Sequence, residues 1–227
     1  MSLNQIKIAF YSLFLTNKFG LKLRKVRDAG EVTKLRLEYS EVLLSRLNIS
    51  VETKGTEKIH QGGQYLILSN HRSIIDPLIV EIALKNKGVN GSWIAKKELY
   101  NSFFFGIFVR NAGCILLDRD LKQVWSFFKD IKTKVAQGHS ICTFPEGTRN
   151  KGDATLSGFK KGPEIIAMKN RLQILPVFIK TKSNDVLMES IKNNTKDLKV
   201  IVEIGDLIDC KDRSRTLEES YKHRFNL

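Results

Sequence analysis

The chain is poor in cysteine, proline and histidine. Its 227 residues include three cysteines, four prolines and four histidines. An odd, small number of cysteines gives no disulfide framework, and the lack of a Cys-x-x-Cys pair argues against a structural zinc site. Cys114 and Cys142 stand inside apolar runs, which is typical of buried, reduced thiols. We therefore expect a protein of the reducing cytoplasm.

A long hydrophobic run is also missing. The longest one near the N-terminus, residues 8–15, already contains Tyr11 and Ser12, whereas a membrane-spanning helix needs about 20 mostly apolar residues. No secretory signal with a small-residue cleavage site is visible. Hydrophobic residues make up 42% of the chain, enough for one substantial core and too few for a polytopic membrane protein.

Negative charge is scarce. The 38 lysines and arginines outnumber the 24 acidic residues, which gives a net charge of +14. Such a charge attracts phosphates, anionic lipid surfaces or acidic carrier proteins, and a solvated basic surface that aids solubility is the alternative. The basic residues are spread along the chain and no nucleic-acid-binding module is recognisable, so we expect no nucleic acid partner.

Residues 1–48 differ in pattern from the rest. A stretch that begins at Asn4 is dense in large apolar residues and is flanked by basic ones, namely Lys18, Lys22, Arg24, Lys25 and Arg27. Ala29 and Gly30 are expected to break it, and residues 31–47 carry apolar side chains at helical spacing. Two helices with basic flanks suit a membrane-associating segment over residues 1–48, and a helical hairpin packed on the core is the alternative.

From residue 49 onward, short apolar strands alternate with helices. Strands are expected at residues 65–69, 93–95, 114–117, 141–144, 174–179 and 199–204, and helices at 77–84, 121–136 and 159–169. Pro176 predicts an edge position or a strand start, because proline cannot donate a hydrogen bond. The alternation predicts an α/β fold in which helices flank a largely parallel central sheet, forming one domain over residues 49–227.

His71 and Asp76 form the first chemical motif, just after a predicted strand. A continuous helix would turn side chains five positions apart about 140° away from each other. Pro77 favours a helix start with Asp76 as its N-cap, so that residues 71–75 can bend and bring His71 back. A helix cap beside an ordinary loop histidine is the alternative. Neither Ser69 nor Ser73 has the surroundings of a nucleophile, so we interpret His71 as a general base and Asp76 as its partner.

A second motif, residues 144–149 (FPEGTR), follows another predicted strand. Pro145 fixes one backbone angle, and Gly147 permits one that bulkier residues avoid. Arg149 offers a planar guanidinium suited to phosphate oxygens, while a loop closed by a Glu–Arg ion pair is the alternative. Residues 158–162 (GFKKG) are expected to open a helix whose N-terminus favours anions. Arg119 ends a third predicted strand and means little alone.

Together, four strings resemble the glycerolipid acyltransferase family, most closely the bacterial 1-acylglycerol-3-phosphate acyltransferases. Residues 70–76 are similar to its His-x4-Asp motif, and residues 144–149 match its third motif residue for residue. Residues 113–119 and 174–177 are similar to its second and fourth motifs. The likeness covers roughly residues 65–179. Gln173 departs from the proline that many relatives carry there, and residues 1–48 lack the long spans of membrane-bound relatives.

The resemblance implies acyl transfer from a thioester, either acyl-CoA or acyl-ACP (an acyl chain carried by acyl carrier protein), to the free hydroxyl of a lysophospholipid. His71 and Asp76 are the implied catalytic pair, and Glu146 is expected to contact the glycerol part or to fix Arg149. The implied substrate-binding residues are Arg119, Glu146, Gly147, Thr148 and Arg149. No metal or redox cofactor is implied. The implied location is the cytoplasmic face of the cell membrane, with peripheral or monotopic attachment to its anionic surface.

The favoured acceptor is 1-acylglycerol-3-phosphate, which would give phosphatidic acid. A member of the same family that acts on a non-phosphate lyso-lipid, such as a lyso-ornithine lipid, is the main alternative. A catalytically idle lipid-binding relative is another, and the intact His71 and Asp76 argue against it.

Overall fold

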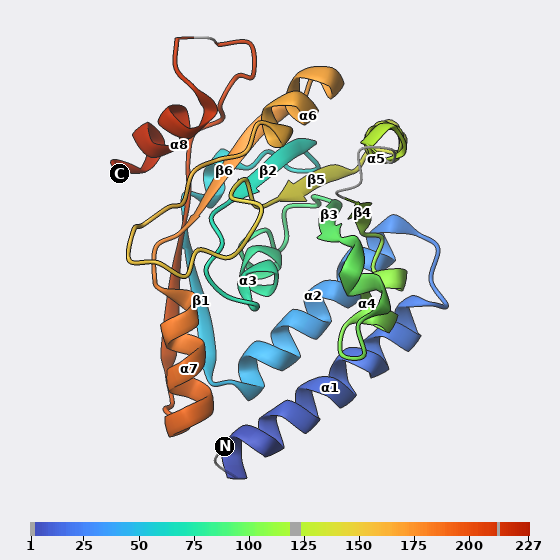
Figure 1. Cartoon of the computed structure of the whole chain (residues 1–227), viewed down its shortest axis with the longest axis vertical. Helices are drawn as coiled ribbons and strands as arrows, with labels where there is room; N and C mark the ends of the chain where they lie inside the picture. The colour runs from blue at the N-terminus through green and yellow to red at the C-terminus, as the bar shows by residue number, and fades with distance from the viewer. Residues whose placement is uncertain (1–2, 119–123, 213) are drawn as a thin grey trace.

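The computed structural model describes residues 3–118, 124–212 and 214–227. Two helices, α1 (Leu3–Leu23) and α2 (Ala29–Arg46), precede an alternating α/β region (Figure 1). The strands are β1 (Ile49–Lys54), β2 (Tyr65–Ser69), β3 (Gly91–Lys96), β4 (Ile115–Leu117), β5 (Ser140–Thr143), β6 (Gln173–Ile179) and β7 (Leu198–Ile204). The other helices are α3 (Asp76–Ala83), α4 (Gly106–Asn111), α5 (Val124–Ala136), α6 (Gly162–Asn170), α7 (Ser183–Asn193) and α8 (Leu217–Phe225). Short 3-10 turns cover Thr56–Lys58 and Lys97–Asn101.

The strands form one seven-stranded sheet in the order β1-β7-β6-β2-β5-β3-β4. Every pairing is parallel except that of β6 with β7, so the prediction of a largely parallel sheet flanked by helices is confirmed. The central strand β2 is buried along its whole length, as expected where helices cover both faces.

The prediction of an edge position or a strand start for Pro176 is wrong on both counts, because β6 lies between β2 and β7 and Pro176 stands in the middle of it. The β6–β7 ladder ends at the pair Val177–Ile204, and an isolated bridge joins Ile174 to Ile208 beyond it. Pro176 therefore lies at an interruption of the ladder, where its missing N–H removes no strand-to-strand bond.

Two apolar clusters pack against the sheet, one on each face. Side chains from α1, α2, α3 and α7 share one cluster with strands β1, β6 and β7. Side chains from α5, α6 and α8 form the other cluster with β2, β5 and β6. Figure 1 shows α1 and α2 at the opposite end of the view from α6 and α8.

Helices α1 and α2 pack on the α/β region through this shared core. Tyr39, Leu43 and Leu44 of α2 are buried, and α1 contacts α2, α4 and α7. Gly20 allows the close approach to α4, since an added Cβ would come within 2.8 Å of Ile107. Among the described residues, neither α1 nor any other helix combines the length and the apolar composition that a membrane-spanning helix requires. The membrane role of residues 1–48 stays a prediction.

Two expected helix boundaries differ from the structure. Ala29 and Gly30 begin α2 instead of breaking a helix, because the Asp28 side chain caps α2 by accepting from the Glu31 N–H at 2.9 Å. Helix α6 begins at Gly162 and not near residue 158, with Pro163 in its first turn. A longer helix would place that proline in the interior, where it breaks the hydrogen-bond ladder.

Candidate active site

The two long motifs meet because they follow neighbouring strands. Strands β2 and β5 are parallel, with Leu68 paired to Thr143. Their carboxyl ends therefore lie at one edge of the sheet, so the turn after β2 lies beside the turn after β5. A backbone bond from the Asn150 N–H to the His71 carbonyl, 2.7 Å, joins the two segments directly.

His71 and Asp76 form the expected pair. His71 Nδ1 lies 2.9 Å from Asp76 Oδ2, and the imidazole keeps 18% of its surface exposed while the carboxylate is fully buried. Because a carboxylate can only accept, Nδ1 carries the proton and Nε2 offers a lone pair. This arrangement suits a general base with an orienting partner.

Asp76 accepts four hydrogen bonds. Besides His71, its Oδ2 accepts from the N–H groups of Arg72 at 2.6 Å and Ser73 at 2.7 Å, while Oδ1 accepts from Ser183 Oγ at 2.5 Å. Asp76 is the first residue of α3, and Ile75 is the N-cap. The expectation of an N-cap is therefore wrong: the carboxylate closes the bend of residues 71–76, as the bent motif requires.

Glu146 supports His71 from its backbone side. The carboxylate is 2% exposed; Oε1 accepts from the His71 N–H at 2.7 Å, and Oε2 accepts from the Ser157 N–H at 2.8 Å and from its hydroxyl. Both oxygens are therefore engaged inside the protein. This differs from the expected contact with Arg149 or with a glycerol group, because the turn directs Glu146 inward.

The rest of the second motif faces outward. Gly147 has φ +70°, and its N–H donates to the Phe144 carbonyl at 3.0 Å. Gly147, Thr148 and Arg149 are exposed, and Arg149 has no hydrogen bond or ion pair with the described residues. Its guanidinium is available for an anion. Arg119, the other expected phosphate holder, lies outside the described residues.

Residues 158–161 form a loop that packs against the second motif. The Lys160 N–H donates to the Pro145 carbonyl at 2.8 Å, and the Phe159 N–H donates to Glu218 of α8 at 2.9 Å. The side chains of Lys151, Lys160 and Lys161 are exposed. The loop therefore adds positive charge beside the turn, although it is not the helix start that was expected.

Three contributions escaped sequence reasoning. Asn70 is buried and joins β2 to β6, since its side chain bonds both the carbonyl and the N–H of Ile179, at 3.0 and 2.8 Å. Ser183 reaches Asp76 from 107 residues away, and Ser157 binds Glu146. Asn70 could have been suspected from its place next to His71. The two serines carry no local signal, because only the fold brings them near.

The comparisons with known proteins agree with this arrangement. The family model described as Acyltransferase matches residues 50–180. The 1-acyl-sn-glycerol-3-phosphate acyltransferase of Helicobacter pylori is 40% identical over 131 residues, which cover 57% of this chain and 51% of that protein. The protein of the same name from Borreliella burgdorferi is 32% identical over 174 residues, which cover 76% of this chain and 67% of that protein. The chain thus spans about half to two thirds of these curated relatives.

A solved structure has the same fold. It is the crystal structure of the 1-acyl-sn-glycerophosphate (LPA) acyltransferase from Thermotoga maritima. It aligns with a TM-score of 0.70 at 23% identity, covering 99% of this chain and 91% of that one.

Proposed function

Because this chain belongs to the acyltransferase family, we propose that it transfers a fatty acyl group from a thioester to the free hydroxyl of a lysophospholipid. The acceptor is 1-acylglycerol-3-phosphate, and the product is phosphatidic acid. The names of the matched relatives support this acceptor. The observation that carries the proposal is the contact of 2.9 Å between His71 Nδ1 and Asp76, beside the turn of the second motif.

The proposed reaction uses His71 as a proton carrier. Nε2 takes the proton of the acceptor hydroxyl, and the hydroxyl oxygen attacks the carbonyl carbon of the thioester. The carbon–sulfur bond then breaks, and the leaving thiolate takes the proton back from Nε2. Asp76 holds the ring and stabilises the imidazolium between these steps. The step moves a proton and an acyl group without a change of oxidation state, so it needs no redox cofactor, and the proposal assigns no part of it to a metal.

The exposed part of the second motif receives the acceptor headgroup. Arg149 is the anchor for the phosphate, because its guanidinium is exposed and matches phosphate oxygens in geometry. Gly147 and Thr148 form the rest of the binding turn, and Arg119 is the second proposed phosphate holder. Glu146 contributes indirectly, since it holds the His71 backbone and the turn in fixed relation.

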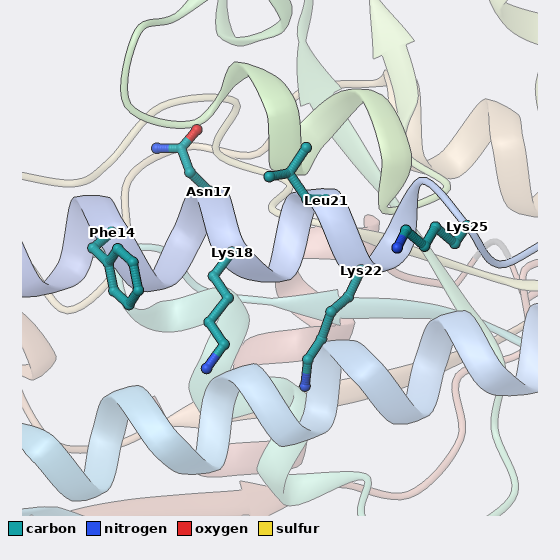
Figure 2. Close-up of a pocket in the computed structure, with 6 residues that line it drawn as sticks. All are labelled: Phe14, Asn17, Lys18, Leu21, Lys22 and Lys25. Carbon is teal, nitrogen blue, oxygen red and sulfur yellow. The ribbon is translucent and has the colours of Figure 1, made fainter.

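Helix α1 is the proposed membrane contact. Its inner side buries Ile8, Leu15, Phe19 and Leu23, yet Phe10 and Phe14 on its outer side are 69% and 63% exposed. A shallow groove of about 420 Å³ on α1 is lined by Phe14, Asn17, Lys18, Leu21, Lys22 and Lys25. Figure 2 shows these side chains along α1, with Lys22 beside α2, where it pairs with Glu38 at 3.1 Å.

Exposed aromatic rings next to lysines fit the boundary of an anionic bilayer. Helix α2 packs in the core, so within residues 1–48 the membrane contact is proposed for α1 alone. The location proposed is peripheral, on the cytoplasmic face of the cell membrane. The donor is acyl-CoA or acyl-ACP, the acylated form of acyl carrier protein, and both carry negative charge that suits a chain of net charge +14.

A donor-by-acceptor activity matrix tests the proposal. Purified protein and the variants His71→Ala and His223→Ala would each be offered acyl-CoA or acyl-ACP as donor, with phosphorylated and unphosphorylated lyso-lipids as acceptors. We expect His71→Ala to lose about 10²–10⁴-fold in kcat, the usual range for a general base. His223 is an exposed histidine on α8 and serves as the matched control. Normal turnover by His71→Ala would refute the mechanism, and a preference for unphosphorylated acceptors would refute the substrate.

A further inference from the structure

The imidazole of His71 rests on a stack of two aromatic rings. The His71 and Phe144 ring centroids are 3.9 Å apart with an interplanar angle of 9°, so the rings are stacked. Trp93 of β3 lies behind Phe144, with centroids 5.1 Å apart and planes at 28°. The three side chains come from three different segments: His71 follows β2, Phe144 follows β5, and Trp93 lies on β3. The stack is therefore built by the tertiary fold and not by neighbours along the chain.

The stack ends on a buried ion pair. The indole N–H of Trp93 donates to Glu81 Oε1 of α3 at 2.8 Å. The same oxygen lies 2.9 Å from Arg36 Nε of α2, as an ion pair without good hydrogen-bond alignment. Arg36 also donates to the carbonyls of Gly91 and Ala112, at 2.5 and 2.9 Å. The support of the rings is therefore tied to α2, α3, β3 and the end of α4.

We propose that Phe144 is a positioning residue for the base, and that Trp93 with the Glu81–Arg36 pair is its support. The inference rests on the proposed function. One hydrogen bond, from Nδ1 to Asp76, fixes a ring edge but leaves the ring free to tilt about that contact. The Nε2 lone pair lies in the ring plane, so a tilt turns it away from the hydroxyl. A parallel ring at 3.9 Å prevents this tilt.

The stack also acts on the charged state of His71. The face of an aromatic ring attracts a cation, and His71 becomes a cation only after it has taken the hydroxyl proton. An interaction that strengthens at this point lowers the barrier without tightening substrate binding. Loss of the ring should therefore reduce kcat more than it raises KM.

Variants that remove or keep the ring test the role of Phe144. We expect Phe144→Leu and Phe144→Met to reduce kcat about tenfold or more, with KM for both substrates changed by less than about twofold. Phe144→Tyr keeps the ring and should restore kcat to near the wild-type value. Phe128→Leu is the matched control, since it removes a partly buried ring from the cluster on the other face of the sheet. Two ringless variants guard against a failure of one to fold, which thermal melting would show.

A spectroscopic signal reports the stack itself. The ring current of Phe144 should shift the NMR signals of the His71 ring protons upfield. These signals can be assigned because they disappear in His71→Ala and the chain has only four histidines. The upfield shift should vanish in the ringless variants and persist in Phe144→Tyr. The inference is overturned if a ringless variant keeps wild-type kcat, if only KM changes, or if Phe128→Leu is equally impaired. Activity retained by His71→Ala would instead defeat the proposed function, while the shift would still show whether the stack exists.

Discussion

The substitution Asp76→Asn separates the charge of this residue from its geometry. With its amide oxygen in the place of Oδ2, asparagine can still accept from His71 and from the N–H groups of Arg72 and Ser73. Its NH2 group, in the place of Oδ1, can donate to Ser183 Oγ, which now lies 2.5 Å away. All four partners stay in contact, but the negative charge is lost and the bond with Ser183 is reversed, since its hydroxyl donates to Asp76 in the wild type.

The size of the effect follows from the distance between the charges. When His71 is protonated, its charge centre lies roughly 4 Å from that of the carboxylate, which corresponds to about 4 kcal/mol at an effective dielectric constant of about 20. The two backbone N–H groups on Oδ2 already offset part of the negative charge, and the amide keeps a favourable dipole. We therefore expect kcat to fall by about 10²- to 10³-fold, since about 1.4 kcal/mol equals a factor of ten.

Steady-state kinetics under saturating substrate would measure this loss, with thermal melting to verify that the variant is folded. Asp28→Asn is the matched control, because Asp28 caps α2 and asparagine caps helices equally well. A kcat of Asp76→Asn within about threefold of wild type, worth less than about 1 kcal/mol, would refute the assigned role of the carboxylate.

Three further predictions concern the phosphate anchor, the membrane face and a buried histidine. Arg149→Ala should reduce kcat/KM about tenfold or more for a phosphorylated acceptor, but not for its unphosphorylated analogue, in parallel acylation assays; equal losses would contradict the anchor. Replacing Phe10 and Phe14 by serine should weaken sedimentation with anionic vesicles by about tenfold or more, whereas Trp125→Ser, at an exposed site on α5, should not; unchanged sedimentation would reject α1 as the contact. Burial, and then the nearby positive charges, lower the pKa of His139 below its ordinary 6.5. Just below pH 6.5 the unfolded chain therefore binds a proton at His139 more readily than the folded chain does. The stabilisation from neutral His139 is present above about pH 6.5 and is lost as the pH falls below it. His139→Gln should flatten the drop in Tm between about pH 7 and pH 5, and parallel melting curves for variant and wild type would contradict this.

The sequence predicted the parts of the fold that depend on neighbours along the chain. Short apolar runs separated by helical stretches predicted the α/β class and most strand positions, because residue periodicity directly reflects which side chains must be buried. The strand β1 and the helices α4, α7 and α8 were not predicted, since their patterns are short or mixed. Boundaries shifted where a single residue decided them, as Asp28 did for α2 and Pro163 for α6.

In the candidate site, too, the features that depend on neighbouring residues were predictable, and those that depend on strand pairing were not. Proline after Asp76 and glycine at position 147 predicted two tight turns, and the short spacing of His71 and Asp76 made their contact a local question. The inward direction of Glu146 was not predictable, because it depends on β2 and β5 being neighbours in the sheet. Arg149 is exposed because the same turn that directs Glu146 inward directs Arg149 outward.

What the sequence alone determined is therefore the pair of chemical groups and the two bends that present them. The strand order, with β2 between β5 and β6, was decided by tertiary packing, and it brought Ser183 to Asp76 and the Phe144 ring onto His71. The physical reason is that hydrogen bonds and ring contacts between distant segments depend on which strands pair. The pairing of the strands minimises the free energy of the whole core. It therefore cannot be predicted from the few residues that make each long-range contact.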